Sequence, residues 1–306
     1  MTDASHQATE AAAPVATSLI ISSRERQSFL ERVLESIFSG SAVPDEIVVI
    51  DQSATPSTRV SELASTSAGR LRYVHTGERG LSRGRNMGIA ISTGASLFFV
   101  DDDVVVPQDW FERMSRRLRE APPRTIVTGR VVAGAAERDG AFAPSLSLSE
   151  EPVTYQGRPG KDVLLPLNMA VPRAAFDDVG SFDVRLGAGS HFPSSEDNDL
   201  GYRLLEAGYT ILYDPTIVVI HRAWRSPAAL LPLRWSYGRG QGAYFAKHFS
   251  RSDRYMLDLL RRDLWRHIRR APRRALANAR DGAGDLVYSA ALIAGAAEWL
   301  VTHRGR

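Results

Sequence analysis

The chain has 306 residues, of which 43% are hydrophobic and 24% are charged, a composition typical of a folded globular protein. It contains no cysteine, which excludes disulfides, zinc–thiolate sites, iron–sulfur clusters and cysteine nucleophiles. The formal net charge is +3, a weak basicity that is compatible with a nucleic-acid partner, an anionic membrane or neither.

The first residues are rich in Ala, Ser and Thr. Residues 1–16 lack the basic and uninterrupted apolar regions of a secretory signal, so we expect a disordered tail. The apolar run at 18–21 then predicts a buried strand, and apolar residues at helical spacing predict a helix over 29–38. A second apolar strand over 46–50 ends at Asp51.

Strands and helices continue to alternate further along the chain. We predict a short strand over 71–74, a helix over 86–91 and a strand over 96–100 that ends in three aspartates, residues 101–103. Alternating strands and helices favour a mostly parallel sheet. In such sheets ligands bind beyond the carboxyl ends of the strands, where Asp51 and the three aspartates lie.

The second half of the catalytic region is less regular. Residues 129–161 show no clear period and predict a loop or irregular sheet over the site, and order returns over 164–171. A helix is predicted over 194–208, with Ser194 or Ser195 as its N-terminal cap and Gly208 at its end. Strands over 210–213 and 217–220 lead into His221.

Three adjacent carboxylates repel one another unless a cation or arginines offset their charge. Mg²⁺ and Mn²⁺ prefer oxygen ligands and commonly bind through one or two carboxylates together with substrate phosphates. Asp101, Asp102 and Asp103 therefore indicate a metal–nucleotide site. A solvated acidic turn is the alternative.

Two further groups support that interpretation. Asp51 could accept hydrogen bonds from a base or ribose, although a lone aspartate more commonly begins a turn. Arg79, Arg83 and Arg85 lie among glycines before Asn86. Glycines allow close backbone approach and guanidinium groups suit phosphate oxygens, whereas alone such a cluster is typical of a solvated loop.

Five segments in this order resemble the family 2 glycosyltransferases of the GT-A fold. They cover roughly residues 17–224 and are Ile20-Ile21-Ser22-Ser23-Arg24, Glu46-Ile47-Val48-Val49-Ile50-Asp51, Gly84-Arg85-Asn86-Met87-Gly88, Phe98-Phe99-Val100-Asp101-Asp102-Asp103 and Ser195-Glu196-Asp197-Asn198-Asp199-Leu200-Gly201-Tyr202-Arg203. The resemblance implies an α/β, Rossmann-like GT-A domain, a three-layer α/β/α sandwich with a mostly parallel central sheet. We assign it residues 17–250, followed by a helical extension over 251–306.

The resemblance also implies a nucleotide diphosphate sugar as donor and a hydroxyl group as acceptor. The residues expected to contact the nucleotide sugar are Ser22, Ser23, Arg24, Asp51, Arg83, Arg85, Asn86, Asp101 and Asp102. Asp101, Asp103 and His221 are the expected ligands of Mn²⁺ or Mg²⁺, although a lone histidine after a strand is more often structural. The expected nucleotide is UDP, with GDP or dTDP as alternatives.

Asp197 matches the catalytic base of inverting members, with Glu196 beside it toward the acceptor. In a single displacement one carboxylate deprotonates the acceptor hydroxyl while the metal offsets charge on the leaving diphosphate. A helix N-terminus is expected to keep Asp197 ionised, and simple helix capping is the alternative role. Asn168 and Trp224 are expected on the acceptor side, with core packing as the alternative for the tryptophan.

The last 56 residues carry a different charge from the rest. Residues 251–306 hold twelve arginines and six acidic residues, a formal +6, so the remainder carries −3 of the chain's total of +3. Leu257, Leu260, Leu264, Trp265 and Ile268 give the arginine-rich part an apolar stripe, as in helices that lie on anionic membranes.

The apolar run over 286–301 is shorter than the ~20 residues that a membrane span needs. We therefore expect a cytoplasmic protein bound peripherally to the inner membrane face. Helices packed on the catalytic domain are the alternative. No nucleic-acid partner is expected because no recognisable binding motif is present.

The sequence thus predicts an inverting, metal-dependent glycosyltransferase of the hexosyl- or deoxyhexosyl-transferring kind, acting on a glycan, lipid-linked or natural-product acceptor, in cell-envelope or polysaccharide biosynthesis. A metal-dependent nucleotidyltransferase is one alternative, but Ser22, Ser23 and Arg24 stand where its glycine-rich phosphate loop would follow the first strand. A catalytically silent, membrane-docked scaffold is the other. The presence of both the aspartate triplet and Glu196-Asp197 argues against it.

Overall fold

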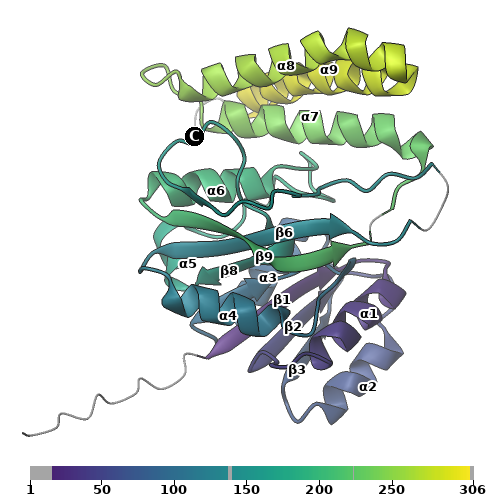
Figure 1. The fold of residues 1–306 in the computed structure, drawn as a ribbon, viewed down its shortest axis with the longest axis vertical. Helices are drawn as coiled ribbons and strands as arrows, with labels where there is room; N and C mark the ends of the chain where they lie inside the picture. Colours follow the sequence, from purple (N-terminus) through teal and green to yellow (C-terminus); the bar gives the residue numbers. More distant parts are fainter. Residues whose placement is uncertain (1–15, 137–139, 223, 304–306) are drawn as a thin grey trace, which may run out of the picture.

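The computed structural model describes residues 16–136, 140–222 and 224–303, so the predicted N-terminal tail lies outside it except for Ala16. Within these residues nine strands form one sheet in the order β3-β2-β1-β4-β8-β6-β9-β5, with β7 paired to β9 (Figure 1). The strands are β1 (Thr17–Ser23), β2 (Glu46–Asp51), β3 (Leu71–His75), β4 (Ser96–Phe99), β5 (Val104–Val105), β6 (Thr125–Ala133), β7 (Val153–Tyr155), β8 (Met169–Pro172) and β9 (Thr210–His221).

The sheet has a parallel half and a mixed half. Strands β3, β2, β1 and β4 are parallel to one another, as predicted, whereas β8 is antiparallel to both β4 and β6. The two strands predicted over 210–213 and 217–220 are a single strand, β9. Where the sequence predicted a break in this strand, the pairing with its parallel neighbour β6 shifts register between Gly129 and Arg130.

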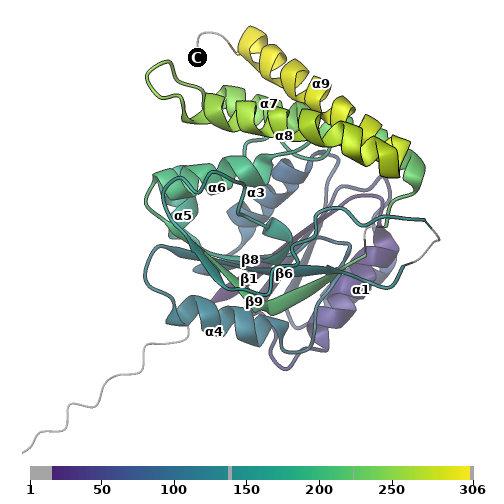
Figure 2. The same ribbon diagram turned by 45° about the horizontal axis from the view of Figure 1, so that its top comes forward.

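Helices cover both faces of the sheet (Figure 2). They are α1 (Gln27–Phe38), α2 (Thr58–Thr66), α3 (Leu81–Ile91), α4 (Trp110–Glu120), α5 (Ala174–Val179) and α6 (Glu196–Glu206). Leu19 and Ile21 of β1 pack with residues of α1, α2 and α4, while Ile20 between them packs with residues of α3, α5 and α6. This alternation along a strand produces the predicted three-layer α/β/α architecture.

Helix α3 begins earlier than the sequence predicts. It starts at Leu81 rather than Asn86, so Arg83 and Arg85 lie on a helix and not in a loop. Glycine allows the helix to approach the sheet closely, because a Cβ added at Gly88 would lie 2.4 Å from Cγ2 of Ile20. The glycines of this segment therefore serve helix–sheet packing.

The predicted serine cap of α6 is wrong, although Gly208 ends the helix region with a φ of 82° as expected. Ser195 has a left-handed backbone (φ 69°) and makes no side-chain cap. The Oγ of Ser194 instead donates to the carbonyl oxygens of Ser236 and Tyr237, and the Oγ of Ser195 donates to Gln241. Both serines thus attach the start of α6 to a later helix.

That later helix, α7 (Leu230–Lys247), belongs to a fourth layer with α8 (Tyr255–Ala277) and α9 (Ala279–Thr302). This layer lies over α6 and farthest from the sheet (Figures 1 and 2). Close contact between α7 and α9 depends on glycine, since a Cβ added at Gly242 or Gly295 would lie 2.0 Å from a carbonyl oxygen of the other helix. The helical extension is therefore packed on the rest of the molecule through α7.

Candidate active site

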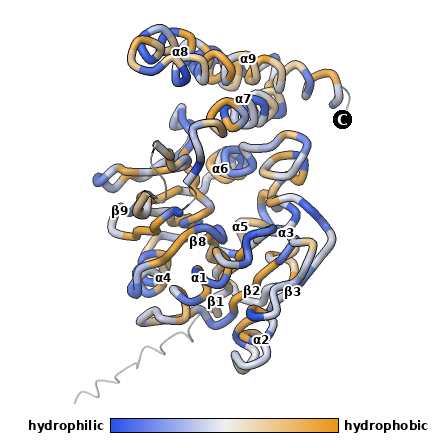
Figure 3. The backbone as a smooth tube through the Cα atoms, turned by 90° about the vertical axis from the view of Figure 1, so that its right-hand side faces the viewer, coloured by the Kyte–Doolittle hydropathy of each residue, from blue (hydrophilic) through white to orange (hydrophobic). Residues whose placement is uncertain are grey.

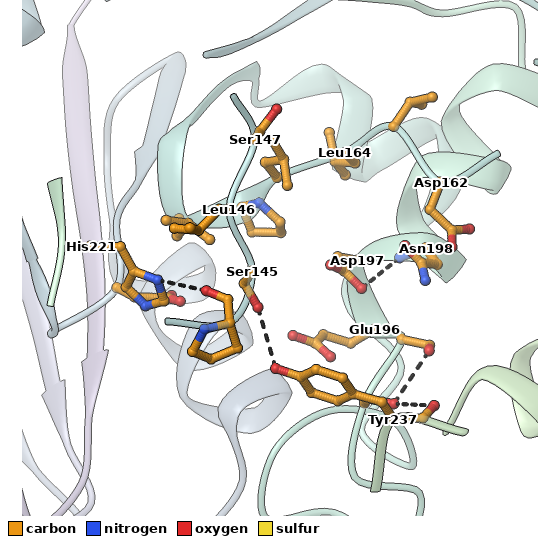
Figure 4. A pocket seen from close by; sticks show the side chains of 18 of the residues that line it. Ser145, Leu146, Ser147, Asp162, Leu164, Glu196, Asp197, Asn198, His221 and Tyr237 are labelled. Atoms are coloured by element: carbon orange, nitrogen blue, oxygen red, sulfur yellow. Dashed lines mark hydrogen bonds between the residues drawn. The ribbon is translucent and has the colours of Figure 1, made fainter. Parts of the chain in front are cut away.

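A pocket of about 660 Å³ lies between the sheet and the α7 layer. Its walls come from distant parts of the chain, including α3, the aspartate triplet, residues 144–149, the N-terminus of α6, the end of β9 and α7. Residues 144–149 belong to the irregular segment that the sequence predicted over the site. Figure 4 shows Asp197, Glu196 and His221 around this pocket, with Tyr237 along one side.

Arginine offsets the negative charge of the aspartate triplet, as the repulsion between adjacent carboxylates requires. Nη1 of Arg26 lies 3.0 Å from Oδ1 of Asp102 and 2.6 Å from Oδ2 of Asp103. The Oγ of Ser23 donates to Asp102 over 2.7 Å. Burial nevertheless raises the pKa of Asp102 to about 6. The side chain of Asp102 is not part of the pocket lining, whereas Asp101 and Asp103 line the pocket.

Asp103 and His221 form a pair at the end of β9. Oδ1 of Asp103 lies 3.2 Å from Nε2 of His221, and Nδ1 of the ring faces the carbonyl oxygen of Pro144 at 3.1 Å. Their mutual contact lowers the pKa of Asp103, despite burial, and raises that of His221. Both residues are buried, and both line the pocket.

These donors suit a hard divalent cation. Carboxylate oxygens and imidazole nitrogen are ligands of Mn²⁺, and Mg²⁺ is commonly held by one or two carboxylates plus substrate phosphates. Among the described residues no group of three His, Asp or Glu side chains already converges on one point. Asp103, His221 and Asp101 therefore present donors of the kind that such an ion uses, without a closed metal cage among the described residues.

Arg85 connects the triplet to the start of α6. Its guanidinium lies 2.7 Å from Oδ1 of Asp101 and 3.0 Å from Oε1 of Glu196, and its side chain is 5% exposed. Because both contacts are charge-assisted and shielded from water, they fix the two acidic segments relative to one another. Arg85 lines the pocket, but its guanidinium is already engaged by carboxylates.

Asp197 has a different environment from Glu196. Within the described chain it has no ion-pair partner, and one of its oxygens accepts from the backbone N–H of Asn198 over 2.8 Å. Burial, followed by the charge of Glu196, raises its pKa to about 8. The direction of this shift opposes the expectation that a helix N-terminus keeps it ionised, because loss of hydration acts against the helix dipole.

Two polar residues near Asp197 were not predicted as site residues. Asp162 accepts from Nε2 of Gln241 over 3.0 Å, and burial with the nearby charge of Asp263 raises its pKa to about 7. Oε1 of Gln241 accepts from Ser195 and from Asn198, at 2.8 and 2.7 Å. Gln241 thus links both chain neighbours of the Glu196-Asp197 pair to α7.

Of the nine residues expected at the nucleotide sugar, Arg85 and Asp101 line this pocket, and the other seven do not: Ser22, Ser23, Arg24, Asp51, Arg83, Asn86 and Asp102. Arg24 and Arg83 are exposed on the surface, and Arg26 rather than Arg24 meets the aspartates. Ser22 is buried against α3, where a Cβ on Gly84 would lie 2.2 Å from its Oγ.

Asp51 and Asn86 are engaged by other parts of the protein. The Asp51 carboxylate is fully buried and accepts from the hydroxyl of Tyr73 at 2.6 Å and from the N–H of Ser53 at 2.9 Å. Asn86 donates to the carbonyl of Phe182 and accepts from its N–H. Neither side chain lines the pocket. Both side chains thus have partners within the protein, and their roles at the nucleotide stay predictions.

The two expected acceptor-side residues are also away from the pocket. Asn168 is fully buried and bonds to Nε1 of Trp110 and to the carbonyl oxygens of Arg130 and Ile217, at 2.9, 3.0 and 2.9 Å. It ties together the central strands, and these contacts support a packing role, while its acceptor role stays an untested prediction. Trp224 is half-buried with its indole N–H unpartnered, and Tyr237 lines the pocket instead.

Comparison with known proteins identifies the class of protein. The architecture matches GT-A structures, including a mannosyltransferase from Pyrobaculum calidifontis in complex with GDP-Man and Mn²⁺, with a TM-score of 0.59, 19% identity, and coverage of 95% of this chain and 80% of that one. TarS from S. aureus, residues 1–349, matches with a TM-score of 0.56, 13% identity and coverage of 92% of both chains. The chain has a GT-A glycosyltransferase fold.

The sequence comparisons define the family. The model of glycosyl transferase family 2 matches residues 18–179, and the chain belongs to this family. The pre-mycofactocin glycosyltransferase of Mycobacterium tuberculosis is 27% identical over 208 residues, which cover 66% of this chain and 42% of that protein. The succinoglycan biosynthesis protein ExoA of Rhizobium meliloti is 26% identical over 247 residues, with 75% and 70% covered.

Proposed function

We propose that this chain transfers a sugar from a nucleotide diphosphate donor to a hydroxyl acceptor, with inversion at the anomeric carbon and with a divalent metal. The observation that carries the proposal is one pocket with two acidic walls. Asp101, Asp103 and His221 line it together with Asp197, and Arg85 bridges Asp101 to Glu196. A donor diphosphate and an acceptor hydroxyl require these two environments at neighbouring positions.

On the donor side, Asp103 and His221, with Asp101, would hold Mn²⁺ or Mg²⁺. When bound, such an ion offsets the charge that develops on the leaving diphosphate. Arg26 holds one oxygen of Asp103, while the other oxygen faces His221. Lys161 and Arg225 also line the pocket and supply positive charge for phosphate oxygens.

On the acceptor side, Asp197 is the proposed base. Its raised pKa of about 8 makes its carboxylate a stronger proton acceptor than an ordinary aspartate. It would take the proton of the acceptor hydroxyl as that oxygen attacks the anomeric carbon and the bond to the diphosphate breaks. Glu196 is held by Arg85 and would orient the acceptor.

A donor panel tests this proposal directly. The full chain is incubated with UDP-, GDP- and dTDP-sugars in the presence of Mn²⁺, and the released nucleotide is separated by chromatography. Release of nucleoside diphosphate supports glycosyl transfer or donor hydrolysis. Pyrophosphate release, as from a nucleotidyltransferase, or absence of both turnover and donor binding for every sugar would contradict it. A thermal-shift series with the same donors ranks the nucleotide, and UDP is our expected first choice.

We also propose that the outer helices bind the cytoplasmic face of an anionic membrane. Trp265 and Ile268 are exposed on α8 beside exposed Arg269 and Arg273. On α9, one exposed stripe is wholly apolar, with members Leu286, Ala290, Ile293, Ala297, Leu300 and Val301. Arginine beside exposed apolar side chains fits an interface of anionic headgroups and acyl chains. These helices are the elements farthest from the sheet in Figure 3.

Peripheral binding is favoured over a membrane span by the packing of α9. At 24 residues the helix is longer than the apolar run in the sequence, and it is the one described helix that is long and apolar enough to cross a membrane. Half of its most apolar window is buried within the protein. Its Asp285 is fully buried and lies 2.8 Å from Nδ1 of His267 on α8. Insertion would break these contacts.

Sedimentation with vesicles tests the membrane proposal. The wild-type chain is expected to sediment with phosphatidylglycerol vesicles at low salt and to be released by high salt. Since each arginine near an anionic surface contributes about 1 kcal/mol, Arg269→Glu with Arg273→Glu should weaken binding at least tenfold. Arg116→Glu with Arg119→Glu, on the exposed side of α4, is the matched control and should bind as wild type. Failure of the wild-type chain to sediment would refute the proposal.

A further inference from the structure

A second pocket of about 610 Å³ adjoins the first. It lies between residues 140–145, the first turns of α7 and the junction of α8 with α9. Three residues, Pro144, Ser145 and Tyr237, line both pockets. The hydroxyls of Ser145 and Tyr237 lie 3.3 Å apart, and Figure 4 shows this pair beside Glu196. A molecule seated in the second pocket can therefore extend past Tyr237 toward Asp197.

One part of the second pocket is apolar. The side chains that form it come from the irregular segment and from α7, and they are Phe142, Ala143, Pro144, Pro227, Leu230 and Leu233. Apolar lining in a concave site favours hydrocarbon over a hydrated sugar. The charged residues of the first pocket combine carboxylates with arginine and lysine, whereas those of the second pocket are three arginines and one aspartate.

The other part of the second pocket is basic. Arg234, Arg274 and Arg280 line it, against a single acidic residue, Asp281. Arg234 and Arg274 share the buried carboxylate of Asp285, at 3.9 and 3.3 Å, and Arg274 lies 3.5 Å from Asp281. The guanidinium of Arg280 makes no ion pair with any described residue. Two carboxylates thus face three guanidinium groups, and one of these carboxylates also contacts His267.

We propose that this second pocket is the acceptor subsite, and that the acceptor carries a phosphate ester next to an apolar chain. The proposal rests on the proposed glycosyl transfer, because it takes Asp197 as the base that the acceptor must reach. The phosphate would contact Arg234 and Arg280, since guanidinium groups bind phosphate oxygens in a bidentate manner. The apolar chain would lie along Phe142, Leu230 and Leu233. The three arginines exclude an uncharged glycan as the ligand best matched to this site.

Binding of octyl phosphate to the full chain tests the proposal, with octyl glucoside and inorganic phosphate as the two single-feature probes. Titration calorimetry below the micelle concentration should give the tightest binding for octyl phosphate. In Arg234→Gln with Arg280→Gln the Kd should rise at least tenfold, and Leu233→Trp, which fills the apolar part, should also weaken binding. Arg116→Gln with Arg119→Gln removes the same charge from the exposed side of α4, outside the pocket, and should leave the Kd unchanged.

Three results would overturn the assignment. Octyl phosphate binding no tighter than octyl glucoside would remove the role of the arginines, and binding no tighter than inorganic phosphate would remove the role of the apolar wall. An equal loss in the α4 control pair would show non-specific charge attraction. Nucleotide-sugar binding is measured on the same samples, so that failure of the donor site is distinguished from failure of this subsite. Donor binding is expected to stay intact in every variant.

Discussion

Two groups of carboxylates lie in the same pocket and have opposite surroundings. Asp101 and Asp103 are matched by Arg85, Arg26 and His221 at 2.7, 2.6 and 3.2 Å. Asp162 and Asp197 have no ion pair among the described residues, and their hydrogen-bond donors are neutral groups of Gln241 and the Asn198 backbone.

The consequence appears in their proton affinities. Contact with His221 and Arg26 keeps the pKa of Asp103 below its ordinary value even though the group is buried. Burial without a cation raises the pKa of Asp162 to about 7 and that of Asp197 to about 8. One side chain type is thus favoured in its ionised form on one wall and holds its proton to higher pH on the other, and the proposed ligand and base roles rest on this contrast.

The substitution Asp197→Asn is expected to have the largest effect on the contrast between the two walls of the pocket. An amide has nearly the same shape but cannot accept the acceptor proton, so kcat is expected to fall about a thousandfold, within the range of general-base contributions. Donor affinity, measured by thermal shift, should stay close to wild type because the donor-side residues are untouched. Asp177→Asn, an exposed aspartate on α5, is the control. Turnover within tenfold of wild type would show that another group is the base.

The donor side is tested by replacing its proposed metal ligand, Asp103. Asp103→Asn keeps the volume of the side chain but lowers its charge, and kcat/KM is expected to fall on the order of a hundredfold, the typical cost of one electrostatic stabiliser. Chelation with EDTA should abolish turnover in the wild-type chain, and added Mn²⁺ should restore it. Full activity in EDTA would contradict a metal-dependent reaction.

The fold on the donor side could be predicted because its signals are local. Strand β1 has three consecutive apolar residues at its centre, Leu19-Ile20-Ile21, as expected for a strand covered on both faces, and Gly208 marks the end of α6. Helix α2 escaped prediction because it is largely polar, with Val60 as its only buried residue. Helix α7 escaped because its Gly238-Arg239-Gly240-Gln241-Gly242 run disfavours helix locally, and packing against α9 and α6 overrides that preference.

The site residues also differ in whether the sequence could predict them. Asp101, Asp103, Glu196 and Asp197 stand in contiguous motifs, and the structure brings all four to one pocket. Arg26 was missed because two arginines flank Glu25, whose left-handed φ of 54° decides how the chain turns. Asp162 and Gln241 come from separate segments with no local pattern, so only tertiary packing reveals them. Local motifs therefore identify the wall of Asp101 and Asp103, which has cationic partners, better than the wall of Asp162 and Asp197, which has none among the described residues.

The substitution Gly242→Ala tests whether packing of α7 against α9 supports the wall of the pocket that contains Asp162 and Asp197. The added Cβ would lie 2.0 Å from the carbonyl oxygen of Leu292, so α7 and α9 must separate, at a cost of about 1–3 kcal/mol. We expect a lower Tm together with reduced kcat, because α7 carries Gln241. Gly284→Ala on α9, whose nearest neighbour would be 3.4 Å away, is the matched control and should be tolerated. Equal Tm changes in both variants would argue against glycine-dependent packing.

The smallest expected effect is that of Asp162→Asn, which tests most directly why the two walls differ in pKa. In Asp162→Asn the amide oxygen can still accept from Gln241, but the charge that helps to raise the pKa of Asp197 is lost. In the wild type, kcat/KM should rise with pH to a plateau above about 8, where Asp197 is ionised. In the variant this rise should move to lower pH by a fraction of a unit.

The stability of the same variant gives an independent readout with a definite sign. The folded protein holds the Asp162 proton more tightly than the unfolded chain does, since its pKa rises from 3.8 to about 7. Wild-type stability therefore falls as pH increases between these values. Replacement by neutral asparagine should raise the Tm relative to wild type at pH 8 and leave it nearly unchanged near pH 4, where the wild-type side chain is protonated. A Tm difference that does not grow with pH would show that Asp162 is stabilised by a cation after all, and the contrast between the two walls would fail.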